Sequence, residues 1–231
     1  MPGRAGGPYG RSVVGHAILR ARGPDALAGW DRPIAAGFAL GSLCFIVGPF
    51  PGVVQLVGVG ADAVIFFAGS ILFTFAASLE LRQATLRRGA RFGMDATWWS
   101  AAVQWIGTLL FNLDTYDAMQ TGLSTHQEDR LIWTPDVIGS ACFLVSGVLA
   151  YRVAVHKGER GRPWHMATIN LAGCVLFMVS AIASYVVPDT GSILDLAAAN
   201  WTTALGAACF LVCAVLLWPT HHHVPSQEVP T

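Results

Sequence analysis

Charged side chains are scarce in this sequence. Only 12% of the 231 residues are Asp, Glu, Lys or Arg, whereas soluble domains carry about 25%. Hydrophobic residues account for 54% of the chain, and its mean hydropathy is +0.53. Because so little charge is present to cover a water-exposed surface, the composition argues against an ordinary soluble domain and indicates an integral membrane protein.

Residues typical of cofactor sites and catalytic centres are also scarce. Lysine occurs once, as Lys157 in a predicted loop, which excludes a retinal Schiff base inside a span. The seven histidines lie in predicted tails, loops or span ends, so no pair inside the membrane could ligate a haem. G-x-S-x-G, P-loop and dinucleotide-binding motifs are absent. We therefore expect no cofactor and no defined metal site, and we disfavour an enzyme without excluding one. His221–His223 could bind a metal ion, but we favour a solvated tail.

Cysteine gives no sign of a disulfide framework. The five cysteines are Cys44, Cys142, Cys174, Cys209 and Cys213; all lie within predicted spans, and no C-x-x-C motif occurs. An odd number of cysteines inside lipid is not typical of a disulfide-linked domain. We interpret them as small buried apolar residues.

Long apolar stretches, in contrast, are abundant. A membrane-spanning helix needs about 20 mainly apolar residues. Six stretches qualify, at approximately 33–50, 61–80, 98–118, 135–155, 165–187 and 199–218. The sequence therefore predicts an all-α polytopic membrane protein, with a bundle of six transmembrane helices over residues 31–219. Residues 1–30 are expected to be mostly disordered, or to form an amphipathic surface helix over 11–22, and residues 220–231 to form a tail.

The basic residues predict the orientation of these helices. Thirteen of the 14 Lys and Arg residues fall in the N-terminal segment, the loop between spans two and three, or the loop between spans four and five. The exception is Arg130, in an alternate loop. Because positively charged loops remain in the cytoplasm, we expect both termini to be cytoplasmic.

The acidic residues show the opposite bias. Asp62, Asp114, Asp117 and Asp136 lie at the predicted outer ends of the spans. We predict that they form an outer acidic vestibule, whose hard oxygen ligands would concentrate cations. Orientation and solubility alone would also account for this bias.

A short motif recurs in every predicted span. It is Gly-x-x-x-Phe, with its glycines at Gly41, Gly69, Gly107, Gly139, Gly173 and Gly206. The intervals between these glycines are 28, 38, 32, 34 and 33 residues, which suggests duplication of a helix or a helix pair. We expect the glycines to let helices approach closely and each phenylalanine to fill the adjacent groove. Inverted repeats of this kind occur in transporters and also in simple bundles.

Span three carries the longest polar stripe. Gln104, Thr108 and Asn112 recur at every fourth residue, so they are expected to share one helix face. Polar groups that face lipid are costly, so the stripe should face the bundle interior, where Ser70 and Thr74 of span two could meet it. The stripe could form a polar path or ligand site, or it could simply make interhelical hydrogen bonds.

Two further polar residues lie at predicted inner ends of spans. Glu80 ends span two, close to Arg82, Arg87 and Arg88 in the sequence, and we expect it to form an ion pair with one of them. Asn170 lies in the first part of span five, where we expect it to cap or cross-link helices.

Most of the predicted membrane region resembles a known family. The residues that carry the resemblance are FALGSLCFIVG (38–48), FFAGSILFTFAASLEL (66–81), VQWIGTLLFN (103–112), WTPDVIGSACFLVSGVLAY (133–151), NLAGCVLFMVSAIASYVVP (170–188) and ANWTTALGAACFLVCAVLLWP (199–219). They are similar to bacterial integral membrane proteins that contain YrhK-like domains. The resemblance implies a multi-pass protein of a bacterial cytoplasmic membrane. It implies no catalytic residue, because that family has no assigned activity.

Two classes of function remain open. The first, which we favour, is a small transporter or channel for an ion or polar solute, with the stripe as its path and the acids as its vestibule. It predicts that Gln104→Leu or Asn112→Leu abolishes flux and leaves the fold intact. The second is a non-catalytic scaffold or accessory subunit whose Gly and Phe faces bind partner helices. The expected partners are the lipid bilayer and either a second copy or another membrane protein, and no nucleic acid is expected.

Overall fold

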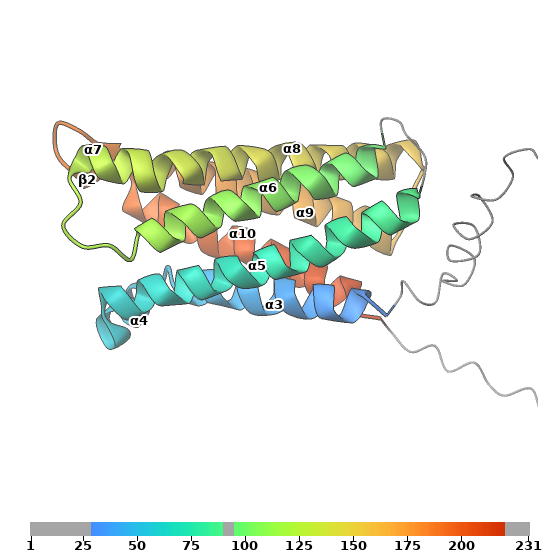
Figure 1. Ribbon diagram of the computed structural model, residues 1–231, viewed down its shortest axis with the longest axis horizontal. Helices are drawn as coiled ribbons and strands as arrows, with labels where there is room; N and C mark the ends of the chain where they lie inside the picture. Colours follow the sequence, from blue (N-terminus) through green and yellow to red (C-terminus); the bar gives the residue numbers. More distant parts are fainter. Residues whose placement is uncertain (1–28, 90–94, 220–231) are drawn as a thin grey trace, which may run out of the picture.

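The computed structural model describes residues 29–89 and 95–219. In these ranges the regular secondary structure is helical apart from one short hairpin, which confirms the predicted all-α class. The long helices are α3 (Asp31–Val47), α5 (Val59–Arg88), α6 (Ala96–Asp117), α8 (Thr134–His156), α9 (Arg162–Ala183) and α10 (Leu196–Leu217). Each packs against the next along the chain and α10 packs against α3, so the helices form a closed ring. Figure 1 shows this bundle from the side, with the long helices running along its length. The predictions for residues 1–28, for residues 220–231 and for His221–His223 concern parts of the chain outside the described ranges.

Four helical segments of the described chain are long and apolar enough to cross a membrane, by length and composition: Val59–Arg88, Thr125–His156, Arg162–Ala183 and Leu196–Leu217. These four segments make the chain compatible with a membrane-embedded protein. The other two members of the ring are shorter or more polar. α3 has 17 residues, and α6 carries Gln104, Asn112 and Asp114 among its apolar residues.

Several helix ends are set by local capping. Asp95 caps α6, where its Oδ1 accepts a hydrogen bond from the backbone N–H of Thr97 at 3.0 Å. Asp195 caps α10 by accepting from the backbone N–H of Ala198 at 2.9 Å. These carboxylates satisfy N–H groups that the first turn of a helix leaves unpaired. Gly89 ends α5 with a φ of 61°, a conformation that glycine adopts without strain.

Three helix boundaries differ from the ends of the predicted spans. α5 continues beyond residue 80 to Arg88. Span five ends as a helix at Ala183, after which β1 (Val186–Val187) and β2 (Ser192–Ile193) form an antiparallel hairpin. The predicted loop 118–134 is helical from Thr125, because α7 (Thr125–Glu128) and the π-helix η1 (Asp129–Trp133) run directly into α8. Apolar content marks where a chain can meet lipid, whereas helical hydrogen bonding can start earlier or end later.

The antiparallel order separates charge between the two ends of the ring. One end, which we call the basic end, carries Arg32, Arg82, Arg87, Arg88, Arg152, Lys157, Arg160 and Arg162. The opposite end, which we call the acidic end, carries Asp62, Asp114, Asp117, Glu128, Asp129, Asp136, Asp189 and Asp195, with Arg130 as its basic residue. At the basic end Arg82 lies over the ring of Trp30, 4.9 Å from its centroid. The short helix α4 (Pro51–Val57) connects α3 to α5 at the acidic end.

Glycine and phenylalanine interlock reciprocally within each helical hairpin. A Cβ atom added at Gly107 in α6 would lie 2.8 Å from the ring of Phe143 in α8, and one at Gly139 in α8 would lie 3.3 Å from the ring of Phe111 in α6. The same reciprocal arrangement joins Gly41 to Phe73 and Gly69 to Phe45 in α3 and α5, and Gly173 to Phe210 and Gly206 to Phe177 in α9 and α10. Each glycine therefore admits the phenylalanine ring of its partner helix against its own backbone.

The buried face of α6 repeats every seven residues. Ser100, Gly107 and Asp114 are buried, and so are their neighbours at positions 101, 108 and 115. In all six motifs the residue after the glycine is small and buried: Ser42, Ser70, Thr108, Ser140, Cys174 and Ala207. When two helices coil slightly around each other, residues spaced by seven stay on the helix face that contacts the partner. The motif is therefore better described as Gly-small-x-x-Phe.

Candidate functional site

The six motif phenylalanines meet at the centre of the ring, and we call them the phenylalanine layer. They are Phe45, Phe73, Phe111, Phe143, Phe177 and Phe210, each at most 7% exposed. The Phe177 ring contacts several of the others, with centroids 5.9 Å from Phe45, 5.8 Å from Phe111 and 5.2 Å from Phe210. A void of only about 10 Å³ remains at this level. One water molecule needs about that much space, so the layer closes the centre of the ring.

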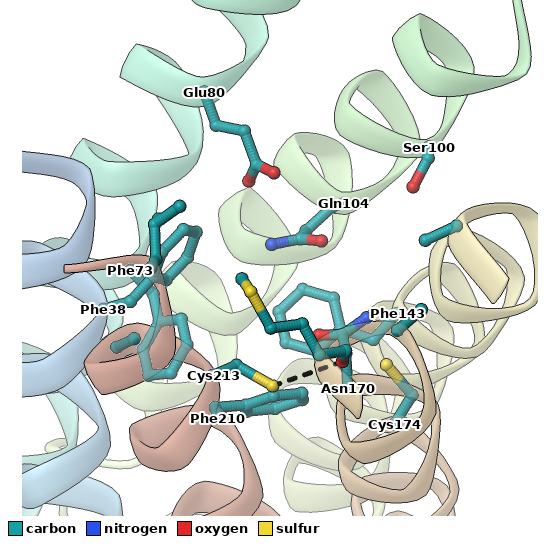
Figure 2. Close-up of a pocket in the computed structure, with 15 residues that line it drawn as sticks. Phe38, Phe73, Glu80, Ser100, Gln104, Phe143, Asn170, Cys174, Phe210 and Cys213 are labelled. Carbon is teal, nitrogen blue, oxygen red and sulfur yellow. Dashed lines mark hydrogen bonds between the residues drawn. The ribbon is translucent and has the colours of Figure 1, made fainter. Parts of the chain in front are cut away.

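A cavity of about 240 Å³ lies between the phenylalanine layer and the basic end, and we call it the inner cavity. Residues of all six ring helices line it, including Glu80, Gln104 and Asn170. Figure 2 shows the Glu80 carboxylate and the Gln104 amide directed into the same space, with Asn170 across from Glu80. Phe143 and Phe210 contribute aromatic surface from the layer. Among the described residues that line this cavity, Glu80 carries the only formal charge.

A second cavity, of about 360 Å³, lies between the phenylalanine layer and the acidic end, and we call it the outer cavity. Asp62 of α5, Asp114 of α6 and Asp136 of α8 line it. Three of the four acids assigned to the vestibule are therefore brought to one cavity. Asp117 is not among its lining residues, and its Oδ1 accepts a hydrogen bond from Nε2 of Gln120 at 2.5 Å.

Two of the outer-cavity carboxylates contain oxygens without a protein partner. Asp62 is 9% exposed and Asp114 is 5% exposed. Oδ1 of each is buried and accepts no hydrogen bond from the described residues. Burying a charged oxygen without a partner is costly, so these two atoms are suited to water, a proton or a cation from the cavity.

Asp136 is held differently from the other two acids. Its Oδ2 accepts a hydrogen bond from Oγ of Ser184 at 3.2 Å, and its Oδ1 lies 3.5 Å from Oγ of Ser140. These hydroxyl contacts orient the carboxylate from α8 and from the end of α9. Within the described ranges, no group of three or more His, Cys, Asp or Glu side chains is placed to hold a metal ion.

The predicted polar stripe does not form one continuous line. Gln104 lines the inner cavity. Thr108 is fully buried beside the phenylalanine layer, and its Oγ1 donates to the carbonyl oxygen of Trp105 at 2.8 Å. Asn112 lines none of the cavities described above. Because four residues turn a helix by about 400°, each step of four rotates the side chain by about 40°, which carries Asn112 away from the axis.

Asn112 instead joins α6 to α5. Its Nδ2 donates to Oγ1 of Thr74 at 2.9 Å, and Oγ1 of Thr74 donates to the carbonyl oxygen of Thr108 at 3.3 Å. Ser70 makes a parallel connection, with its Oγ 2.9 Å from Oγ1 of Thr115. Asn112, Thr74 and Ser70 therefore make the interhelical hydrogen bonds that were the alternative to a polar path.

Glu80 and Asn170 are the cavity residues whose position sequence reasoning missed. Glu80 was expected to form an ion pair and Asn170 to cap or cross-link helices, and it was not predicted that both line the inner cavity. A simple signal was present, since Glu80 lies seven residues after Phe73 and Asn170 lies seven residues before Phe177. Gln104 likewise lies seven residues before Phe111. The seven-residue spacing thus places all three side chains about two helical turns from the phenylalanine layer, toward the basic end.

Comparison with known proteins gives no relative. No protein-family model matches the chain, and no match is found among the curated proteins or among the solved structures. Function is therefore inferred from the two cavities and the layer between them.

Proposed function

We propose that this chain is a small transporter or channel for cations, with six spans in a bacterial cytoplasmic membrane. Support for α3 and α6 as additional spans comes from their exposed apolar side chains, such as Leu40 at 54% in α3 and Leu113 at 54% in α6. The basic end would face the cytoplasm, because Lys and Arg are enriched in cytoplasmic loops. Membership of the YrhK-like family remains part of this proposal and is carried by the sequence resemblance alone.

The observation that carries the proposal is a pair of cavities on opposite sides of one narrow apolar layer. Both are lined by residues of all six ring helices, so both lie on the axis of the ring. Carboxylates line both cavities, and no Lys, Arg or His is among the described residues that line either one. Such a lining favours cations over anions at both ends of the path.

The phenylalanine layer supplies the barrier that such a path requires. Apolar constrictions stop ions because the narrow space does not hold the water that an ion carries. The void of about 10 Å³ at this level describes a closed state. Passage would require the Phe rings to move apart, and Thr108 and Ser70 beside them would then be hydroxyl partners for the passing solute.

The scaffold alternative loses its proposed binding faces in this fold. It requires Gly and Phe surfaces that are free to receive partner helices. Each of the six motif glycines instead faces a phenylalanine of the same chain. The internal interlock therefore favours the transport proposal.

A flux assay in proteoliposomes tests the proposal. The purified chain would be reconstituted, and uptake of rubidium and of methylammonium would be measured for wild type, Gln104→Leu, Asp114→Asn and Asn112→Leu. We expect the first two substitutions to lower flux, because each removes a polar group from a cavity. Asn112→Leu, for which the sequence predicted loss of flux, now serves as the matched control and should retain flux, because Asn112 lies at a helix interface. Equal flux in all four proteins would contradict the proposed path.

A further inference from the structure

We propose that the inner cavity is a binding site for a protonated primary amine with a short apolar tail. The inference deepens the proposed function by naming a class of cation, and it rests on that function for its biological role. The evidence lies at one level of the ring, where Glu80, Gln104 and Asn170 line the same cavity as four phenylalanines.

Three acceptors at one level match the donors of a primary ammonium group. Such a group carries three N–H donors and no acceptor. Glu80 offers a carboxylate, while Gln104 and Asn170 each offer an amide oxygen, and the three come from α5, α6 and α9. Each lies seven residues from a phenylalanine of the layer, so the acceptors surround the axis at a common height. Oε1 of Gln104 already accepts from Oγ of Ser146 at 3.2 Å, which orients the amide.

The negative formal charge of the inner cavity favours a cationic ligand. Glu80 is the single formally charged side chain among the described lining residues. A bound monovalent cation would neutralise it, whereas the carboxylate would repel an anion. A transition-metal ion fits less well, because the described residues contain no group of three or more His, Cys, Asp or Glu able to hold one.

The remaining surface of the cavity suits an apolar tail. Phe38, Phe73, Phe143 and Phe210 line it, and aromatic faces attract cations as well as apolar groups. A volume of about 240 Å³ exceeds the roughly 150 Å³ in which an engineered apolar cavity holds benzene. The site therefore has room for an ammonium group joined to one ring by a short chain.

Calorimetric titration of the full-length protein in detergent tests this inference directly. The probes are 2-phenylethylammonium, its N,N,N-trimethyl derivative and the neutral isostere 2-phenylethanol. We expect saturable binding of the primary ammonium with one site per chain, weaker binding of the trimethyl derivative, and no saturable binding of the alcohol. Glu80→Gln should weaken binding of the primary ammonium by about tenfold or more, because it removes a charge-assisted hydrogen bond.

Two further variants separate recognition from general effects. Glu159→Gln makes the same chemical change at the basic end outside the cavity lining and should leave the affinity unchanged. Asn170→Leu should reduce the preference for the primary over the trimethyl ammonium, because it removes one acceptor. Equal binding of 2-phenylethanol, no saturable binding of the amine in the millimolar range, or unchanged affinity in a folded Glu80→Gln protein would overturn the inference. Because binding is measured without flux, amine binding without cation flux would refute the proposed function alone, and rubidium flux without amine binding would refute this inference alone.

Discussion

Replacing Gly107 by alanine tests the glycine and phenylalanine interlock most directly. The new methyl group would lie 2.8 and 2.9 Å from two atoms of the Phe143 ring and 3.0 Å from the carbonyl oxygen of Gly139. The ring cannot move freely, because it is 5% exposed and its centroid lies 5.0 Å from that of Phe111. The new methyl group also meets the backbone of α8, at that Gly139 carbonyl oxygen.

The expected magnitude follows from two opposing effects. Overpacking a close contact costs about 1–3 kcal/mol, whereas replacing Gly by Ala inside a helix gains about 1 kcal/mol of helix propensity. We therefore expect Gly107→Ala to lower the free energy of unfolding by up to about 2 kcal/mol. Gly60→Ala is the matched control, since a Cβ there meets no atom within 4 Å, and it should be neutral or stabilising. Gly139→Ala should cost less than Gly107→Ala, because its nearest contact is 3.2 Å.

The assay is reversible unfolding in mixed micelles, followed by tryptophan fluorescence. A double-mutant cycle with Phe143→Leu adds a second test, because the smaller side chain should relieve the clash and make the combined cost less than the sum of the two single costs. The reasoning would be refuted if Gly107→Ala and Gly60→Ala had the same effect on unfolding, or if the cycle showed no coupling.

Two other predictions follow from the contacts of single residues. Asn112→Leu should lower the free energy of unfolding by about 1 kcal/mol, because it removes the interhelical hydrogen bond to Thr74; an unchanged unfolding midpoint would count against that contact. Phe177→Leu should raise cation flux in proteoliposomes, because it removes a ring from the centre of the phenylalanine layer, at a stability cost of about 1–3 kcal/mol for the cavity it leaves. Flux unchanged in a folded Phe177→Leu protein would exclude the layer as the barrier.

Much of the architecture could be predicted from the sequence because it depends on local residue patterns. Low charge and long apolar stretches predicted an all-α chain, and the helices formed where those stretches lie. The recurring glycine and phenylalanine positions identified the residues at the closest helix approaches. Their reciprocal partners, such as Gly107 with Phe143, could not be read from the sequence alone, because the pairing depends on which helices become neighbours and at what height.

The candidate site was predicted only in part, and the reason is geometric. The polar stripe was inferred from a spacing of four, which drifts around the helix, whereas the ring buries residues at a spacing of seven. Gln104 therefore reached a cavity and Asn112 did not. Glu80 was assigned to neighbouring arginines because sequence proximity suggested an ion pair, while the repeat from Phe73 directs it to the inner cavity. Asp62, Asp114 and Asp136 converge because their helix ends meet at one end of the ring.

Ion selectivity of the reconstituted wild-type chain is the decisive test of a cation path through the ring. Rubidium and chloride uptake would be compared in proteoliposomes and in protein-free liposomes under an imposed membrane potential. The two carboxylate-lined cavities predict rubidium uptake above the protein-free level with no increase for chloride. No uptake of either ion, or uptake of chloride equal to that of rubidium, would contradict a cation path through the phenylalanine layer.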